Sequence, residues 1–385
     1  MKVISILGST GSIGKSTLEV VRLHKDNFKI FALSCDTNIN LLLKQAAEFK
    51  PSYLVCSTKN DAIQLGKMLP SNISSKVLYS SDANNFLAEH DEVTHVVAAI
   101  SGSAGLESTF NAAKSGKTIL LANKESMVMG GPLFKILIEQ DICKVIPIDS
   151  EHNAIFQILN TSAQNRKNFK NIILTASGGP FLNTPFDDLK KVTVDDALNH
   201  PNWNMGKKVT IDSATMMNKG LEIIEAAYLF NLSHDQIKVL IHPQSIIHSL
   251  VEYYDGSLLT QLGIPDMKIP ISYALGFPDR IISGLSGIDL TKKDLQFLEP
   301  DLKKFPCLNL AYDAIKSGHS YCVALNASNE IAVDAFLKNK IPFTDIYKIN
   351  CEVMKSIDIA KLDTLSDVFN YDLYIRKAIA SKIKN

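Results

Sequence analysis

The segment Gly8-Ser9-Thr10-Gly11-Ser12-Ile13-Gly14 decides the fold of the N-terminal part of the chain. It directly follows the apolar run of residues 3–7 and opens a stretch with helical spacing. Glycines at this spacing allow a tight turn between a strand and a helix, and they let a pyrophosphate approach the N-terminus of that helix. A plain strand-to-helix connection is the alternative. The position of the turn within a β-α-β pattern favours dinucleotide binding.

The first 149 residues alternate short apolar runs with amphipathic stretches, which predicts an α/β domain with a Rossmann-type, doubly wound parallel sheet. Several of the apolar runs lack polar alternation, as expected for strands that are covered on both faces. The strands are expected at residues 3–7, 29–33, 53–56, 96–100, 118–121 and 145–148.

Beyond residue 149 the pattern changes. We expect an α+β domain over residues 150–276, with a strand at 172–176 and a hairpin of residues 250–254 and 257–261. Residues 277–302 are rich in Gly, Asp, Pro and Lys and are predicted to be a linker. A helical C-terminal domain is expected over residues 303–385, with helices at 308–316, 324–337, 343–355 and 372–384.

Composition excludes several functional classes. The 385 residues include 40 basic and 40 acidic ones, so the net charge gives no basic surface for nucleic acid or for an anionic membrane. No apolar run reaches the roughly 18 residues that a membrane span requires. The six cysteines are irregularly spaced, which indicates reduced thiols in a cytoplasmic protein. Only four basic residues are arginines, so a phosphate site must use Lys, hydroxyl and backbone N–H groups.

The end of the second predicted strand bears on the choice of dinucleotide. Asp36, Thr37 and Asn38 lie where a Rossmann domain contacts the adenosine ribose. A carboxylate at this place favours the free 2′-hydroxyl of NAD, whereas a 2′-phosphate requires a cation nearby. Asp36 is equally compatible with a turn or a helix cap. These residues by themselves leave the phosphate state of the cofactor open.

Polar residues follow two further strands. Asn123-Lys124-Glu125-Ser126 comes after residues 118–121, and Asp149-Ser150-Glu151-His152-Asn153 comes after residues 145–148. Ligands of doubly wound sheets bind at the carboxyl ends of the strands. The pair Asp149 and Glu151 suits a hard divalent cation that prefers oxygen ligands. An acidic helix cap is the alternative.

A third polar cluster lies in the segment of residues 212–222. Asn218, Lys219 and Glu222 share one face if this segment is a helix, which makes Glu222 a candidate third carboxylate for the cation. A solvated face with one salt bridge is the alternative. Ser177-Gly178-Gly179, Ser213, Asn218 and Lys219 together could hold a phosphate without arginine.

The loop of residues 198–208 contains His200, Trp203, Met205 and Gly206. Trp203 is the only tryptophan of the chain, and its place among turn-forming residues is typical of a lid that closes over a substrate. The alternative is a loop that Trp203 anchors to the core.

Taken together, these motifs resemble the 1-deoxy-D-xylulose 5-phosphate reductoisomerase family. The resemblance follows the family's order along essentially the whole chain and rests on segments 8–14, 121–126, 149–156, 177–181, 200–206, 212–222 and 242–245. It implies conversion of 1-deoxy-D-xylulose 5-phosphate to 2-C-methyl-D-erythritol 4-phosphate in the non-mevalonate route to isoprenoids. It further implies NADPH, a divalent cation (Mg²⁺ or Mn²⁺, with Co²⁺ as a further candidate) and a homodimer.

The resemblance also implies roles for individual residues. Metal ligands would be Asp149, Glu151 and Glu222, and proton transfer would involve Lys124 and Glu151. The substrate would contact Lys124, Ser150, Glu151, Ser177, His200, Trp203, Ser213, Asn218, Lys219 and Glu222. The cofactor would contact Gly8, Thr10, Gly11, Ser12, Ile13, Asn38, Asn123, Glu125 and Gly206.

One departure from the family concerns the cofactor. Asp36-Thr37 stands where family members often place a small or basic pair beside the 2′-phosphate. We therefore expect NADPH to be preferred over NADH by a reduced margin.

Two rival hypotheses give different experimental results. A metal-independent Rossmann dehydrogenase of another small phosphorylated substrate would keep its activity in EDTA. A non-catalytic dinucleotide sensor would bind cofactor without turnover and would tolerate Glu222→Gln.

Overall fold

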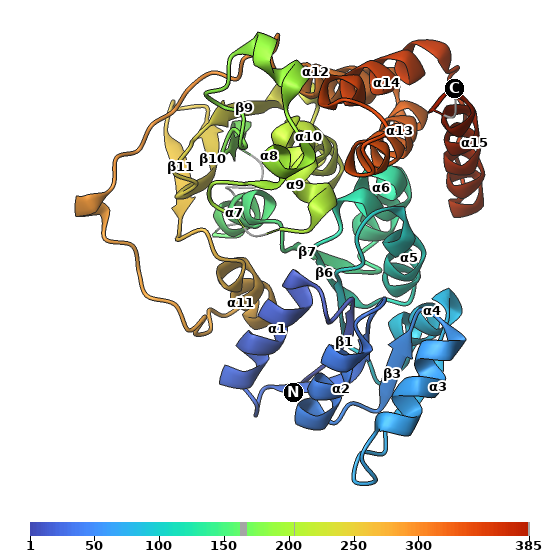
Figure 1. The fold of residues 1–385 in the computed structure, drawn as a ribbon. Coiled ribbons are helices and arrows are strands. Elements are labelled where there is room, and N and C mark those ends of the chain that lie inside the picture. Colours follow the sequence, from blue (N-terminus) through green and yellow to red (C-terminus); the bar gives the residue numbers. More distant parts are fainter. Residues whose placement is uncertain (162–167, 204, 384–385) are drawn as a thin grey trace. The chain divides into compact units, whose positions relative to one another are not determined.

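The computed structural model describes residues 1–161, 168–203 and 205–383. The chain forms two compact units (Figure 1). The first unit contains Met1–Ser126, Phe134–Asn153 and Asp266–Ser286, and the second contains Met127–Leu133, Ala154–Pro265 and Gly287–Asn385. Each unit is therefore assembled from segments that are distant in sequence.

The first unit is built on a seven-stranded parallel sheet in the order β4-β3-β2-β1-β5-β6-β7. The strands are β1 Lys2–Leu7, β2 Phe28–Ser34, β3 Tyr53–Cys56, β4 Lys76–Tyr79, β5 His95–Ala98, β6 Thr118–Leu121 and β7 Lys144–Pro147. The strand order reverses between β1 and β5, which is the ligand-binding switch point of a doubly wound sheet. The predicted fold class is confirmed, and β4 is an additional edge strand that the sequence pattern did not predict.

The helices between these strands are α1 Ser12–Leu23, α2 Ile39–Phe49, α3 Lys59–Met68, α4 Ser81–Glu89, α5 Leu106–Lys114 and α6 Lys124–Glu139, of which residues 127–133 belong to the second unit. α7 Ser150–Leu159 follows β7 and passes from the first unit into the second after Asn153, and α11 Lys268–Gly276 belongs to the first unit. The last of these, α11, returns to this unit late in the sequence and packs against α1. Its C-terminal end is fixed by Lys2, whose Nζ donates to the carbonyls of Leu275 and Phe277 at 2.6 and 2.9 Å.

The second unit contains a four-stranded sheet in the order β11-β10-β8-β9. Its strands are β8 Phe169–Ala176, β9 Ile237–Ile241, β10 Ile247–Tyr253 and β11 Leu258–Leu262. β10 runs antiparallel to β8 and β11, whereas β8 and β9 are parallel. The predicted hairpin is confirmed as β10 and β11. β9 was not predicted.

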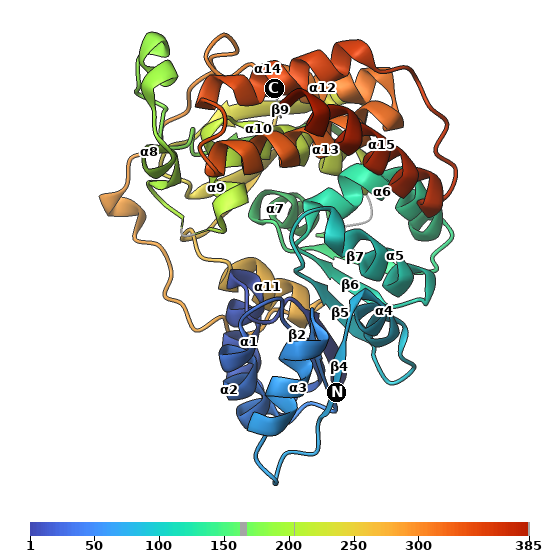
Figure 2. The same cartoon turned by 45° about the vertical axis from the view of Figure 1, so that its right-hand side comes forward.

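Helices fill the remainder of the second unit. They are α8 Val194–Leu198, α9 Lys207–Ala214, α10 Met217–Leu229, α12 Cys307–Ser317, α13 His319–Leu337, α14 Phe343–Ser356 and α15 Leu365–Ile383. α13 contacts both α14 and α15 (Figure 2). Ile172 and Leu174 of β8 form a buried core with Ile223 of α10 and Leu308 of α12. The four helices predicted after residue 302 are present, although Lys384 of the predicted last helix lies outside the described residues.

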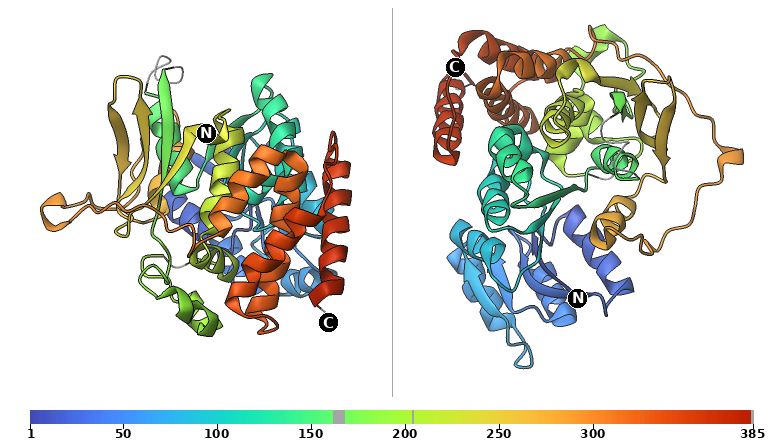
Figure 3. Two further views of the ribbon diagram at one scale, coloured as in Figure 1. Left: turned by 90° about the horizontal axis from the view of Figure 1, so that it is seen from above. Right: turned by 180° about the vertical axis from the view of Figure 1, so that it is seen from behind.

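The segment predicted as a linker is shared by the two units, since residues up to Ser286 belong to the first and those from Gly287 to the second. Figure 3 shows it in orange as a long trace that contains the single turn η4 Leu290–Lys292. Leu298 makes one antiparallel bridge with Ile241 of β9. All six cysteines are free thiols, and five of them are buried. Within the described part of the chain, no helix is both long and apolar enough to cross a bilayer.

Candidate functional site

The glycines of the first turn are needed for different reasons. Gly8 has φ +89°, and a Cβ atom there would lie 2.7 Å from the carbonyl oxygen of Ala99. A Cβ on Gly14 would lie 2.4 Å from Cα of Ser9, so only glycine lets the helix pack this closely on the turn. Gly11 is the N-cap of α1. The turn therefore brings the backbone close to the carboxyl ends of β1 and β5.

The N-terminus of α1 suits an anion. Among the described residues, no side chain caps this end and no acidic residue lies in the first turn. The N–H groups of the first turn and the positive end of the helix dipole are thus directed at whatever binds there. Gly11 and Ser12 are exposed, and Thr10 and Ile13 are half-buried. This arrangement fits the pyrophosphate of a dinucleotide.

The ribose-side candidates lie in an exposed turn after β2. The Asp36 carboxylate accepts a hydrogen bond of 2.8 Å from the Ser57 hydroxyl, which follows β3. The Asn38 side chain accepts a hydrogen bond of 3.1 Å from the N–H of Leu41 and caps α2. Asp36 is therefore held toward β3, and the side-chain oxygen of Asn38 has a structural role.

Asn123 links α6 to the loop that follows β5. Its side-chain oxygen accepts from the N–H of Ser126 at 3.2 Å and caps α6, while Nδ2 donates to the carbonyls of Ile100 and Gly102 at 2.5 and 3.0 Å. The side chain is buried, as is that of Glu125 in the first turn of the same helix. The family resemblance implied a cofactor contact for Asn123 but not this anchoring role.

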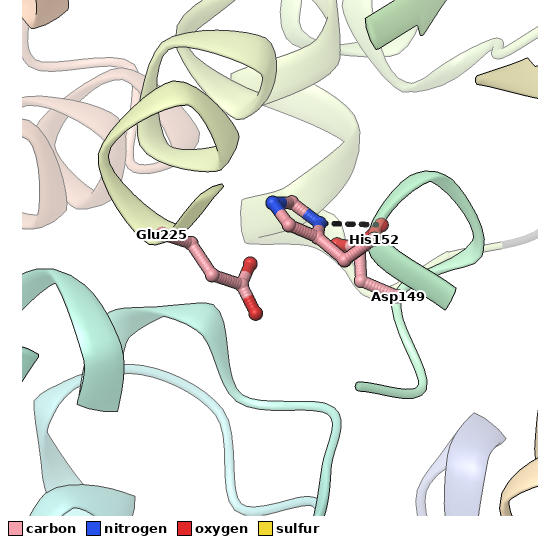
Figure 4. Close-up of side chains that lie close together, drawn as sticks. All are labelled: Asp149, His152 and Glu225. Atoms are coloured by element: carbon pink, nitrogen blue, oxygen red, sulfur yellow. Dashed lines mark ion pairs between the residues drawn. The ribbon is translucent and has the colours of Figure 1, made fainter. Parts of the chain in front are cut away.

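Asp149 lies at the end of β7 between two basic groups. Its Oδ2 is 2.5 Å from Nζ of Lys124, and its Oδ1 is 3.8 Å from Nδ1 of His152 (Figure 4). Burial raises the pKa of Asp149, but the Lys124 ammonium and the contact with His152 outweigh burial and hold this pKa well below its usual range. The carboxylate is therefore ionised at neutral pH.

The neighbouring residues fix this turn. The N–H of Asn153 donates to the carbonyl of Asp149 at 2.8 Å, and its Nδ2 donates to the carbonyl of Pro147 at 2.7 Å. The Ser150 hydroxyl donates to a Glu151 carboxylate oxygen at 2.6 Å. Asp149 and Glu151 thus stand on one ordered turn at the carboxyl edge of the sheet, and their oxygens are the ligand type that Mg²⁺ and Mn²⁺ prefer.

In the second unit, a glycine pair follows β8. Gly178 and Gly179 have φ +84° and +66°, which is the left-handed region that favours glycine. A Cβ atom on Gly179 would lie 2.7 Å from the carbonyl oxygen of Ser213 in α9. The pair therefore lets the loop that carries Ser177 pack directly on α9.

His200 joins this loop to α9. Its Nε2 lies 3.1 Å from the hydroxyl of Ser177 and 3.1 Å from that of Ser213. Its Nδ1 accepts hydrogen bonds from the N–H groups of Asn202 and Trp203 at 3.2 and 3.0 Å. Nδ1 therefore carries no proton, and in the neutral ring the proton is on Nε2. Burial lowers the pKa of His200 and so favours this neutral form.

The face of α10 is arranged as the spacing of its residues predicts. Nδ2 of Asn218 donates to one carboxylate oxygen of Glu222 at 2.6 Å, and Nζ of Lys219 donates to the other at 2.5 Å. Lys219 and Glu222 are both buried. A buried, paired lysine and glutamate are inconsistent with the alternative of a solvated helix face.

The loop around Trp203 is tied to other parts of the second unit. Nδ2 of Asn202 donates to the carbonyl of Pro243 at 2.7 Å and to the Ser245 hydroxyl at 3.0 Å. The half-buried Trp203 ring lies 6.4 Å from the ring of His248. Gly206 is exposed and is the N-cap of α9. Asn204, in the middle of the predicted lid, lies outside the described residues.

The candidate residues are divided between the two units. The first unit contains the glycine turn, Asn38, the pair Lys124 and Asp149, and Glu151. The second contains the His200 cluster with Ser177 and Ser213, and the α10 face with Glu222.

Comparison with known proteins places these features in one family. Family models described as 1-deoxy-D-xylulose 5-phosphate reductoisomerase, its C-terminal domain, and DXP reductoisomerase C-terminal domain match residues 4–131, 145–230 and 262–378. The 1-deoxy-D-xylulose 5-phosphate reductoisomerase of Geobacter metallireducens is 50% identical over 98% of both chains. That of Vesicomyosocius okutanii is 47% identical over 100% of this chain and 99% of the relative.

Solved structures agree. A crystal structure of DOX-P reductoisomerase in complex with NADPH, fosmidomycin and magnesium has a TM-score of 0.95 and 45% identity, covering 100% of this chain and 98% of the other. The Zymomonas mobilis enzyme in complex with NADPH has a TM-score of 0.92 and 40% identity, covering 100% and 99%.

Proposed function

The chain belongs to the 1-deoxy-D-xylulose 5-phosphate reductoisomerase family, and on this premise we propose which of its residues carry out the NADPH-linked, metal-dependent conversion of 1-deoxy-D-xylulose 5-phosphate to 2-C-methyl-D-erythritol 4-phosphate. The observation that carries the assignment is the contact of one neutral histidine, His200, with the hydroxyls of Ser177 and Ser213.

We propose that the glycine turn and the N-terminus of α1 bind the pyrophosphate of NADPH. The cofactor contacts would come from Gly8, Thr10, Gly11, Ser12, Ile13, Asn38, Asn123, Glu125 and Gly206. The support is the close backbone approach at Gly8 and the absence of an acidic residue from the first turn of α1 in the described chain. When bound, NADPH supplies the hydride.

Asp149, Glu151 and Glu222 are the proposed ligands of the divalent cation. Their support is the chemistry of the donor set, because three carboxylates suit Mg²⁺ or Mn²⁺ better than a softer metal. When bound, the cation polarises the carbonyl and hydroxyl oxygens of the substrate. Nζ of Lys124, 2.5 Å from Asp149, and the carboxylate of Glu151 are the proposed groups for proton transfer.

The substrate phosphate is proposed to bind the hydroxyls of Ser177 and Ser213, the amide of Asn218 and the ammonium of Lys219. His200 would keep both hydroxyls in place and offer its Nε2 proton as a further donor. This set supplies hydrogen bonds and a charge without arginine, as the composition requires. Ser150 and Trp203 would contact the rest of the substrate, and the loop of residues 198–208 would exclude water from it.

A cytoplasmic homodimer is the proposed assembly. Its support, beside the family resemblance, is β11, an edge strand on which Leu258 and Leu259 are exposed. A molar mass near 42.4 kDa in solution, that of a single chain, would contradict the dimer.

We also propose that the chain is divided into functional domains at residues 1–149, 150–276 and 303–385.

The reaction is tested by following NADPH oxidation with 1-deoxy-D-xylulose 5-phosphate and Mg²⁺ or Mn²⁺. EDTA should abolish the oxidation, and Asp149→Asn should lower kcat/KM at least about 100-fold, since even groups behind a metal ligand cost 10- to 100-fold. Asp187→Asn is the matched control, because the Asp187 side chain is 90% exposed and belongs to the second unit. Activity that survives EDTA would instead support a metal-independent dehydrogenase, and cofactor binding without turnover would support a sensor.

A further inference from the structure

A chain of buried polar side chains connects α9 to two C-terminal helices. Asp212 of α9, Asn329 of α13 and Asn350 of α14 are each at most 1% exposed. Nδ2 of Asn329 donates to Oδ1 of Asp212 at 2.7 Å, and Nδ2 of Asn350 donates to Oδ1 of Asn329 at 3.1 Å. Nζ of Lys208 lies 2.9 Å from the other carboxylate oxygen of Asp212. All four residues belong to the second unit.

The order of donors and acceptors makes this chain directional. A buried carboxylate is costly unless both its charge and its lone pairs are satisfied, and Lys208 and Asn329 each bind one oxygen of Asp212. Because a carboxylate paired with lysine accepts hydrogen bonds, Asp212 requires Nδ2 of Asn329 on its side. Asn350 supports the same orientation of the Asn329 amide by donating to its Oδ1.

The same helix carries part of the proposed phosphate site on another side. Ser213 directly follows Asp212, so the two side chains leave α9 about 100° apart. The Ser213 hydroxyl lies 3.1 Å from Nε2 of His200, and its carbonyl packs on Gly179. Rotation of α9 about its axis would therefore displace the Ser213 hydroxyl whenever it displaced Asp212.

The apolar contacts of α9 do not fix this rotation by themselves. Ile211 and Ala214 pack in a cluster with Ala332 and Val333 of α13. Apolar contact is non-directional and tolerates small rotations and shifts, whereas hydrogen bonds weaken steeply as their geometry changes. In a buried setting, a chain of hydrogen bonds therefore selects one arrangement among those that the apolar surfaces allow.

We propose that Asn329, supported by Asn350, is a positioning residue for the substrate-phosphate site. It holds Asp212 and thereby sets the rotation of α9 that places the Ser213 hydroxyl beside His200. The C-terminal helices thus tune phosphate affinity although they supply no phosphate ligand. This inference rests on the phosphate site proposed above.

The test compares two buried asparagines of the same helix. Asn329→Ala should weaken binding of inorganic phosphate, measured by calorimetry, about tenfold, which is about 1.4 kcal/mol. It should raise KM for 1-deoxy-D-xylulose 5-phosphate by a similar factor and leave KM for NADPH unchanged. Asn326→Ala is the matched control, because Asn326 is equally buried one turn earlier and its Nδ2 donates to Glu330, at 3.4 Å, rather than toward α9.

Thermal unfolding of both variants separates positioning from stability. Equal losses of phosphate affinity in the Asn326 and Asn329 variants, or wild-type affinity in Asn329→Ala, would overturn the inference. If Asn329→Ala does not fold, Asn350→Ala is the deciding variant. It should weaken phosphate binding about threefold, equal to about 0.7 kcal/mol, and an unchanged phosphate affinity in this variant would overturn the positioning role of Asn329.

Ser213→Ala tests the phosphate site itself. If this variant binds phosphate like the wild type, the proposed site is wrong. If it weakens binding while the Asn329 and Asn350 variants do not, only the positioning role fails. In a double variant, the effects of Ser213→Ala and Asn329→Ala should be less than additive, since both act through the same hydroxyl.

Discussion

The two ring nitrogens of His200 have different hydrogen-bonding roles. Nδ1 accepts the N–H groups of Asn202 and Trp203 and so shapes the loop, while Nε2 faces two serine hydroxyls. Protonation of Nδ1 would remove the acceptor that the loop requires. The shape of the loop and the Nε2–H donor at the proposed phosphate site therefore depend on the same tautomer of the neutral ring. Burial of the ring favours the neutral form.

Asp36 is the residue for which we predict an effect on cofactor choice. NADPH should be preferred over NADH by a reduced margin. The margin is reduced because the exposed Asp36 carboxylate, held by Ser57, repels a 2′-phosphate and accepts a hydrogen bond from a 2′-hydroxyl. Asp36→Ala should strengthen binding of adenosine 2′,5′-bisphosphate relative to AMP by about three- to fivefold, the size of an exposed charge interaction. Calorimetry with the two nucleotides and the ratio of kcat/KM for NADPH and NADH measure this.

The control for Asp36 is Asp26→Ala. Asp26 is exposed and precedes β2, so its removal changes the net charge equally at the opposite edge of the sheet. Turnover with NADH equal to or better than that with NADPH in the wild type would contradict the expected preference. An unchanged nucleotide ratio in Asp36→Ala would show that the carboxylate does not contact this part of the cofactor.

At the scale of elements, the central strands of both sheets were predicted, as were the edge strands β7 and β11, whereas the edge strands β4 and β9 were not. β1, β2, β5, β6 and β7 are apolar because helices or neighbouring strands cover them, and their sequence shows it. β4 lies at the edge of its sheet, and its apolar run Val77-Leu78-Tyr79 is short and nowhere fully buried. β9 was missed despite a usable signal, since its buried residues alternate with less buried ones.

Helix caps explain why some site roles cannot be read from residue type. Asn38 and Asn123 cap α2 and α6, and an asparagine at the start of a helix has the same appearance in a sequence whether it binds a cofactor, caps the helix or does both. The α10 cluster was predictable, because residues three and four apart on a helix must share a face. The contacts of His200 with Ser177 and Ser213 were not, because three separate segments meet there.

For the whole molecule, a net charge of zero conceals a local arrangement of opposite charges. Lys124 pairs with Asp149 in the first unit, and Lys219 pairs with Glu222 in the second. Asp149 and Glu222, two of the three acids proposed to bind the cation, thus each have an ammonium group beside them. This local neutrality lets carboxylates be buried without an overall acidic surface.

Half-buried histidines predict how the stability of the protein depends on pH. Burial, and next the positive charge of Lys2, lower the pKa of His95 to about 4 in the folded protein. Burial lowers the pKa of His200 and His319 as well. An unfolded histidine has a pKa of about 6.5, so the unfolded chain takes up protons first as the pH falls. The contribution of these neutral histidines to the free energy of unfolding is thus fully present above about pH 6.5 and is lost as the pH falls toward 4.

The midpoint of urea unfolding at pH 7.5, 6.5, 5.5 and 4.5 measures this loss. In His95→Gln, the unfolding midpoint of the first unit should fall less steeply as the pH is lowered, because Gln cannot be protonated. Gln can keep a hydrogen bond to the Thr94 hydroxyl, which lies 2.8 Å from Nδ1 of His95 in the wild type. His234→Gln, at a position outside the hydrophobic cores beside Asp235, should leave the decline as in the wild type. The carboxylate of Glu252 accepts hydrogen bonds from Asn171, Lys238 and Lys170, which lower its pKa to about 2, so its contribution to stability is lost mainly below about pH 4.5, at the acid end of the histidine window. A midpoint that stays constant from pH 7.5 to 4.5 would contradict the half-buried, neutral state of these histidines.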